Sequence, residues 1–235
     1  MKKNIPNIIT LLNLASGIVA IILALHDYLH AAAIMVIVAS LFDFCDGLTA
    51  RLLHVHSLIG KELDSLSDVV SFGVAPAIIM YQLLLKSHDF ILPHYGINIP
   101  ALICPVLFAC FAAYRLAKFN LDTLQTENFR GLPTPTAAFV LISFPFFQMN
   151  DYSIIIYIIT ILVLSFLMIS TIPLFSLKFK NLKPKDNIFR YIIIFISILL
   201  LGCLQFKAIP FIVLIYILLS MIELYLNKRL KKTSE

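Results

Sequence analysis

The sequence has little charge, no tryptophan and no closely paired cysteines. Only 13% of its 235 residues are charged and 60% are hydrophobic, whereas soluble domains are about one quarter charged and about half apolar. Such a chain has too few polar residues to cover a water-soluble fold, and it is too apolar to be disordered. The four cysteines lie in apolar runs without a C-x-x-C pair, which excludes a disulfide framework and a zinc knuckle. The sequence therefore predicts a single integral membrane domain over residues 1–235.

Eight apolar runs approach the length that a helix needs to cross a bilayer. They lie at about residues 7–25, 31–52, 65–85, 101–119, 134–149, 152–171, 189–205 and 208–227. The fifth and sixth runs are separated only by residues 148–151, and the last two only around residues 205–208, so these joints are either tight hairpins or kinks. The predicted fold class is an all-α, polytopic membrane helix bundle with about eight transmembrane helices.

Lysine and arginine are unevenly distributed among the predicted loops. With the N-terminus in the cytoplasm, sixteen of the eighteen basic residues fall on the cytoplasmic side, and Lys86 and Lys207 fall outside. Basic residues accumulate on the cytoplasmic side of membrane proteins. We therefore expect a multi-pass protein of the cell (inner) membrane with both termini in the cytoplasm. The net charge of +5 then reflects this orientation and the lipid surface, and no nucleic-acid partner is expected.

Five of the thirteen acidic residues lie between positions 43 and 68. Carboxylates in or near a membrane span are costly and usually functional. At about 100° per residue, Asp43 and Asp46 share one face of the second predicted span. Asp64 and Asp68 share one face of the third, while Glu62 points away. Two antiparallel helices would thus present four carboxylates to a common space.

Small residues accompany these acids, namely Gly47, Ala50 and Gly60. We expect them to remove side-chain bulk that would hold the two helix backbones apart. Crowded carboxylates repel one another unless cations neutralise them, and oxygen ligands without His or Cys favour Mg²⁺ or Mn²⁺ over zinc. Two such ions about 4 Å apart would suit phosphoryl chemistry.

The residues around the acids form a motif of fixed spacing. The chain reads Asp43-Phe-Cys-Asp46-Gly47-Leu-Thr-Ala50-Arg51, then eight residues, then Gly60-Lys-Glu-Leu-Asp64-Ser-Leu-Ser-Asp68. All eight fixed positions resemble the signature of the CDP-alcohol phosphatidyltransferases. That family comprises integral membrane enzymes that move a phosphatidyl or related phospho-group from a CDP-linked donor to an alcohol and release CMP.

The resemblance implies roles for individual residues. Asp43, Asp46 and Asp64 would be metal ligands, and Asp68 would be a ligand, the general base, or both. The residues expected to bind CDP-diacylglycerol are Asn7, Thr10, Gly47, Arg51, Ser57 and Gly60. Other interpretations stay open for three of them: Arg51 as a flanking charge, Asn7 as a helix cap and Thr10 as a hydroxyl bonded to the backbone.

Further segments resemble the membrane-embedded phosphatidylserine synthases. They are Asp68-Val-Val-Ser-Phe-Gly73-Val-Ala-Pro76-Ala, Tyr114-Arg115-Leu-Ala-Lys118-Phe-Asn120 and Phe129-Arg130-Gly131-Leu132-Pro133-Thr134-Pro135, with Lys118 where Arg and Thr134 where an apolar residue is expected. A serine acceptor carries a carboxylate that needs a cation, and Arg115, Lys118 and Arg130 are candidates on the cytoplasmic side. The other interpretation is that these three are ordinary cytoplasmic flanking charges.

The function predicted from the sequence is phosphatidyl transfer from CDP-diacylglycerol to the hydroxyl of L-serine at the cytoplasmic face. Residues 1–140 would form the catalytic core, and residues 150–235 additional spans with a basic tail. Direct displacement is expected because the chain has no His-x-Lys pair and no evident covalent nucleophile. The alternatives are another acceptor such as glycerol 3-phosphate and, more remotely, a divalent-cation transporter. The resemblance also implies a possible homodimer.

Overall fold

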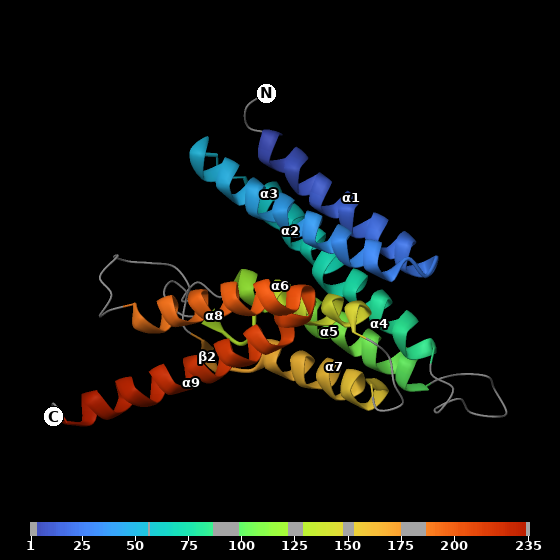
Figure 1. Ribbon diagram of the computed structural model, residues 1–235. Helices are drawn as coiled ribbons and strands as arrows, with labels where there is room; N and C mark the ends of the chain where they lie inside the picture. Colours follow the sequence, from blue (N-terminus) through green and yellow to red (C-terminus); the bar gives the residue numbers. More distant parts are fainter. Residues whose placement is uncertain are drawn as a thin grey trace.

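The computed structural model describes residues 4–55, 57–86, 99–121, 129–147, 153–174 and 187–233, and these are almost wholly helical (Figure 1). The α-helices are α1 (Ile5–Leu25), α2 (Leu29–Leu52), α3 (Leu58–Asp68), α4 (Ala75–Leu85), α5 (Ile99–Leu121), α6 (Thr134–Ser143), α7 (Ser153–Ile169), α8 (Ile188–Leu204) and α9 (Ile209–Thr233). A π-helical turn, Val69–Val74, joins α3 to α4. Two short strands, β1 (Phe129–Arg130) and β2 (Pro173–Leu174), pair antiparallel. The all-α prediction is confirmed.

The predicted spans coincide with these helices but differ from them in length. Within the described residues, five segments are long and apolar enough to cross a membrane: Ile5–Leu25, Leu29–Leu52, Leu58–Leu85, Ile99–Leu121 and Ile188–Leu226. The fifth and sixth predicted spans form the shorter apolar helices Thr134–Phe146 and Ile154–Ile169. The run predicted for 134–149 loses its α-helical form after Ser143, because Pro145 cannot donate a backbone hydrogen bond.

The last apolar segment contains a break between α8 and α9. Residues Gln205–Ala208 form a 3-10 turn, and Gln205 has a φ of 52°, which helical residues do not adopt. After this turn α9 runs back beneath α8 (Figure 1). The joint around residues 205–208 is therefore a tight reversal of the chain, one of the two possibilities that the sequence left open.

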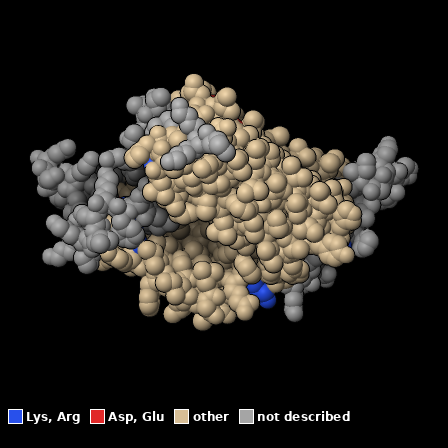
Figure 2. All heavy atoms as spheres, turned by 90° about the horizontal axis from the view of Figure 1, so that it is seen from above, with Lys and Arg blue, Asp and Glu red and all other residues tan. Residues whose placement is uncertain are grey.

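Large apolar side chains cover much of the outer surface. Phe195 is 69% exposed and Phe44 is 62% exposed. Figure 2 shows one face of the molecule, on which almost all of the described side chains are uncharged. Apolar surface on this scale is not stable against water, and helices are one of the two structures whose backbone groups can all be satisfied within lipid. The protein is a multi-pass membrane protein.

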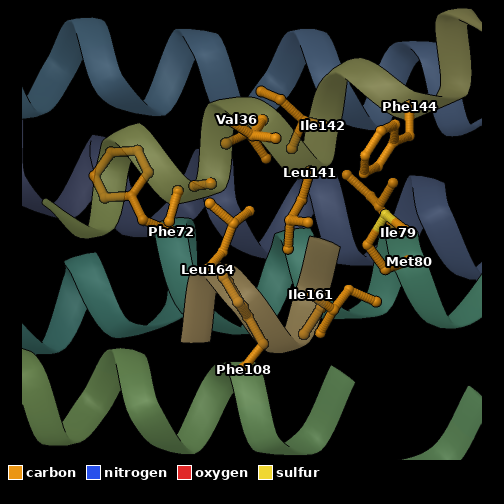
Figure 3. Close-up of a cluster of buried hydrophobic side chains, with 14 of the residues drawn as sticks. Val36, Phe72, Ile79, Met80, Phe108, Leu141, Ile142, Phe144, Ile161 and Leu164 are labelled. Carbon is orange, nitrogen blue, oxygen red and sulfur yellow. The ribbon is translucent and has the colours of Figure 1, made fainter. Parts of the chain in front are cut away.

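The helices converge on a buried apolar core (Figure 3). Val36 of α2, Phe72 of the π-helical turn, Phe108 of α5, Leu141 of α6 and Ile161 of α7 are all fully buried there. Side chains from four helices and the π-helical turn thus pack against one another. This packing fixes the helices on which the acidic residues lie.

Polar contacts gather at the two ends of the first helices. At one end Lys86 Nζ lies 2.8 Å from Asp27 Oδ1, next to the turn between α1 and α2. At the other end Lys61 Nζ donates a hydrogen bond to the carbonyl oxygen of Asn120 at 3.0 Å. The start of α3 therefore meets the end of α5, at the end of the molecule that also holds the acidic motif.

Candidate active site

Three aspartates from two helices meet at one point. Carboxylate oxygens of Asp43, Asp64 and Asp68 all lie within 4.8 Å of one another. Asp64 and Asp68 are one turn apart on α3 and therefore share a face, while Asp43 projects from the last turns of α2. The sequence predicted that acids of these two helices face a common space, and the structure places them so.

Asp46 lies beside this cluster and contacts a third helix. It is 5% exposed, and its Oδ2 accepts a hydrogen bond from Thr10 Oγ1 of α1 at 2.6 Å. The Thr10 hydroxyl also lies 3.0 Å from the Pro6 carbonyl oxygen, but it has one proton, and the shorter contact is with the carboxylate. Asp46 remains close enough to Asp43 and Asp64 for electrostatic repulsion.

Asn13 of α1 contacts the cluster and was not identified from the sequence. It is fully buried, and its Nδ2 donates to Asp68 Oδ1 at 3.2 Å. Its Oδ1 is buried without a hydrogen-bond partner among the described residues. One signal could have found it: Asn7, Thr10 and Asn13 recur every third residue and form a polar face on an otherwise apolar helix.

The two glycines of the motif do not bring α2 and α3 together as the sequence predicted. A methyl group added at Gly47 would have no neighbour within 4 Å among the described residues, and one at Gly60 would meet Asn7 Oδ1 of α1 at 3.0 Å. Gly47 therefore does not bring α2 and α3 together, and the helix that approaches Gly60 is α1. The missing side chain of Gly47 leaves open space beside α2, where α1 also lies against α3.

This space is a pocket of about 240 Å³ between α1, α2 and the start of α3. Asp64 lines it and also belongs to the acidic cluster, so the pocket and the cluster are continuous. The residues predicted to bind the donor that line this pocket are Asn7, Thr10, Gly47, Ser57 and Gly60.

Two of the predicted donor residues also have local structural roles. Ser57 is the N-cap of α3 and accepts a hydrogen bond from the Gly60 amide at 3.2 Å. Arg51 is exposed one turn after Gly47, and its Nε donates to the Gly47 carbonyl oxygen at 3.0 Å, at the edge of the pocket. Asn7 is not the helix cap, because that position belongs to Asn4. The cap interpretation of Asn7 is therefore wrong.

The three basic residues predicted to bind the acceptor have different surroundings. Arg115 of α5 is 9% exposed, donates from Nη1 to Thr134 Oγ1 at 3.1 Å, and lies within electrostatic range of Asp68. Lys118 is exposed. The backbone of Arg130 forms part of β1, but its side chain lies outside the described residues. The structure thus brings one of the three, Arg115, toward the acidic cluster.

The acidic cluster has the donor set of a site for a hard divalent cation. Its ligand atoms are all carboxylate oxygens, and Asp64 Oδ1 is buried without a hydrogen-bond partner among the described residues. Carboxylate oxygens of Asp43 and Asp64 lie within 4.8 Å of each other, and two carboxylate anions at this separation repel each other unless a proton or a cation lies between them. The residues therefore fit a metal of the Mg²⁺ or Mn²⁺ type better than zinc, which prefers nitrogen and sulfur ligands.

Curated proteins with similar sequences carry related names. The chain is 43% identical over 143 residues to archaetidylserine synthase of Methanothermobacter thermautotrophicus, a match covering 60% of this chain and 57% of that protein. It is 35% identical over 142 residues to CDP-diacylglycerol–serine O-phosphatidyltransferase of Bacillus subtilis (60% and 75%). It is 37% identical over 140 residues to the enzyme of that name from Methanocaldococcus jannaschii (60% and 59%). The match thus spans little more than half the length of two of these relatives.

The family match extends beyond the motif. It begins just before α1 and ends after α7, so it includes the acidic cluster, the pocket and Arg115. Because residues 3–172 match the model of the family described as CDP-alcohol phosphatidyltransferase, the chain belongs to that family.

Proposed function

We propose that the protein transfers the phosphatidyl group from CDP-diacylglycerol to the hydroxyl of L-serine, giving phosphatidylserine and CMP. The observation that carries this proposal is the continuity between a pocket at the ends of three helices and a cluster of three carboxylates. The names of the three relatives support serine as the acceptor, since each contains it, although they differ in the lipid.

In this proposal the pocket holds the CDP part of the donor. Gly47 and Gly60 leave the backbones of α2 and α3 open to a ligand, and Thr10 and Ser57 offer hydroxyl groups. Arg51 at the pocket edge supplies positive charge to the diphosphate. The acyl chains remain in lipid beside the exposed apolar side chains of the helices.

The acidic cluster would hold one or two divalent cations, Mg²⁺ or Mn²⁺, through Asp43, Asp64 and Asp68 with Asp46 beside them. When bound, such ions neutralise the diphosphate and stabilise the charge on the attacking and leaving oxygens.

Asp68 and Arg115 act on the acceptor, one as its general base and the other as its binding group. Asp68 takes the proton of the serine hydroxyl, which is too weakly acidic to react at neutral pH without a base. The serine oxygen then bonds to the phosphorus that carries diacylglycerol, the bond from that phosphorus to the bridging oxygen breaks, and CMP leaves with the electron pair. Arg115, within electrostatic range of Asp68, binds the serine carboxylate, and positioning accounts for much of the catalysis.

The proposal places the site at the cytoplasmic face of the cell (inner) membrane. Arg51 and Lys61 lie at the same end of the helices as the acidic cluster, in agreement with the accumulation of positive charge on that side. The proposal includes a homodimer, which the resemblance to the family implies. Light scattering of the purified protein gives the molar mass that tests for a dimer.

A panel of acceptor alcohols tests the reaction. The purified chain in lipid micelles with CDP-diacylglycerol should release CMP with serine but not with glycerol 3-phosphate, inositol phosphate or choline. Chelation should stop the release, and Mg²⁺ or Mn²⁺ should restore it. Asp68→Asn should lower kcat by about 10²-fold or more, because it removes the general base, while Glu62→Gln on the exposed side of α3 should not.

Two results would contradict the proposal. If CMP were released with glycerol 3-phosphate but not with serine, the acceptor would be glycerol 3-phosphate, and the proposed reaction of the donor would still stand. Full activity of a folded Asp68→Asn variant would show that Asp68 is not the general base.

A further inference from the structure

We propose that Thr134 is a positioning residue that fixes the guanidinium group of Arg115 for the acidic group of the acceptor. The inference rests on the proposed function, because it concerns how that acceptor is held and selected. Thr134 stands where the resemblance led us to expect an apolar residue, so the motif does not account for its hydroxyl.

The hydrogen bonding of Arg115 is the first observation. The side chain is 9% exposed, and its Nη1 donates to the hydroxyl oxygen of Thr134, which is fully buried. A guanidinium group has five N–H donors, and within the described part of the chain this is its only hydrogen bond. No Arg115 nitrogen is among the buried atoms that lack a partner within the described residues, so its other donors face accessible space. The remaining donors of Arg115 are therefore available to a ligand with oxygen acceptors, such as a carboxylate.

The surroundings of Arg115 also favour the binding of an acidic acceptor next to Asp68. The guanidinium carbon lies 5.6 Å from the centre of the Phe119 ring, and Asp68 is within electrostatic range. Asp68 itself accepts a hydrogen bond from Asn13. A carboxylate bound by Arg115 would thus place the rest of a small acceptor beside the residue that takes its proton.

The position of Thr134 is set by the loop that precedes it. Thr134 is the first residue of α6, after Pro133. Gly131, with a φ of 78°, donates its amide proton to the Ile172 carbonyl oxygen at 2.9 Å. A methyl group at Gly131 would lie 2.6 Å from the Met168 carbonyl oxygen, so only glycine fits. The loop is therefore tied to the end of α7, and Thr134 presents its hydroxyl from a fixed point.

A fixed arginine binds a carboxylate at a smaller cost in conformational entropy than a mobile one. Valine at position 134 would keep the shape of threonine but remove the hydroxyl that holds Nη1. Acceptor binding would weaken as a result. Donor binding would not, because the donor pocket is lined by residues of α1, α2, α3 and the turn before α3.

Steady-state kinetics on the full chain test this inference. Thr134→Val should raise the KM for serine about fivefold to tenfold, the value of one lost hydrogen bond, and leave the KM for CDP-diacylglycerol unchanged. Thr134→Ser should retain the wild-type KM. Thr136→Val is the matched control, because Thr136 lies on the same helix but lines a separate apolar cavity with α8 and α9, and it should change neither value.

An acceptor without a carboxylate separates positioning from general structural damage. With serinamide, whose amide replaces the carboxylate, Thr134→Val and the wild type should show the same kcat/KM. An unchanged KM for serine in Thr134→Val, or an equal loss with serine and serinamide, would overturn the inference. Thermal unfolding checks that each variant folds, and Thr134→Ala replaces the valine variant should that one not fold.

The same comparison distinguishes this inference from the proposed function. If the wild type used glycerol 3-phosphate instead of serine, the serine proposal would fail. Thr134→Val should then raise the KM for glycerol 3-phosphate, with rescue by Thr134→Ser, and an unchanged KM would reject the role of Thr134.

Discussion

Asn13 contacts Asp68 through one polar atom of its side chain and leaves the other without a partner among the described residues. Its Nδ2 holds Asp68 Oδ1, while its own Oδ1 is buried without a partner among the described residues. An unpaired buried polar atom costs about 1–3 kcal/mol. We therefore expect Asn13→Leu, whose side chain has the same branching and number of heavy atoms, to keep or raise the melting temperature in detergent and to lower kcat about tenfold or more, since a hydrogen bond to a charged group is lost.

Calorimetry and CMP release measure the two effects separately. Ser16→Ala is the control, because Ser16 lies one turn further along α1 and its hydroxyl bonds only the Leu12 carbonyl oxygen within the described part of the chain. It should leave kcat unchanged. A fall in both melting temperature and kcat of Asn13→Leu would mean that Asn13 contributes through packing rather than through Asp68.

At the scale of elements, the close approach of α1 to the π-helical turn positions Asn13. A methyl group at Gly17 would lie 2.9 Å from the Cα of Ser71, and the Ser71 hydroxyl donates to the Asn13 carbonyl oxygen at 3.1 Å. We expect Gly17→Ala to separate the two segments and to destabilise the protein by about 1–3 kcal/mol, the usual cost of overpacking. The melting temperature and the CMP-release rate should both fall.

Gly202 of α8 provides the control for this prediction. A methyl group there would meet nothing within 4 Å among the described residues. Gly202→Ala should therefore keep or raise the melting temperature, because alanine favours a helix over glycine by about 1 kcal/mol. Equal melting temperatures for Gly17→Ala and the wild type would show that α1 can move away without loss.

The elements differ in how far the sequence could predict them. The spans that became α1, α2 and α5 were predictable because apolar length alone determines them, and the meeting of Asp43 with Asp64 and Asp68 followed from helical spacing. The hydrogen bonds from α1 to Asp46 and Asp68 were not predictable, although Asn7 and Thr10 of this helix were expected at the site, because these contacts join residues far apart in the sequence. The same holds for Thr134, whose partner Arg115 lies on another helix.

Small residues illustrate why the remaining details could not be predicted. The pattern around Gly47 and Gly60 predicted close packing of two helices, but a pocket lies there between α1, α2 and α3, and its presence depends on where α1 is placed. The ends of the short helices depended likewise on single residues, such as Pro145 after α6. A span count based on apolar length alone does not detect such interruptions.

For the whole molecule, the orientation in the membrane determines which compartment supplies the acceptor. Tyr28, in the turn between α1 and α2, is 65% exposed, and Leu58, at the start of α3 beside the pocket, is 87% exposed. The two lie at opposite ends of the first helices, because α2 connects them across its full length. Cysteines introduced at these positions, in a chain whose four native cysteines are replaced by alanine, therefore report on opposite sides of the membrane.

In sealed right-side-out vesicles, a membrane-impermeant maleimide should label Tyr28→Cys at once and Leu58→Cys only after the vesicles are permeabilised. The physical reason is the distribution of basic residues, since Arg51 and Lys61 flank Leu58 and positive charge is retained in the cytoplasm. The cysteine-free chain is the control and should remain unlabelled in both conditions. Labelling of Leu58→Cys in sealed vesicles, with Tyr28→Cys protected, would invert the topology and place the acidic cluster outside, where cytoplasmic serine and CDP-diacylglycerol could not reach it.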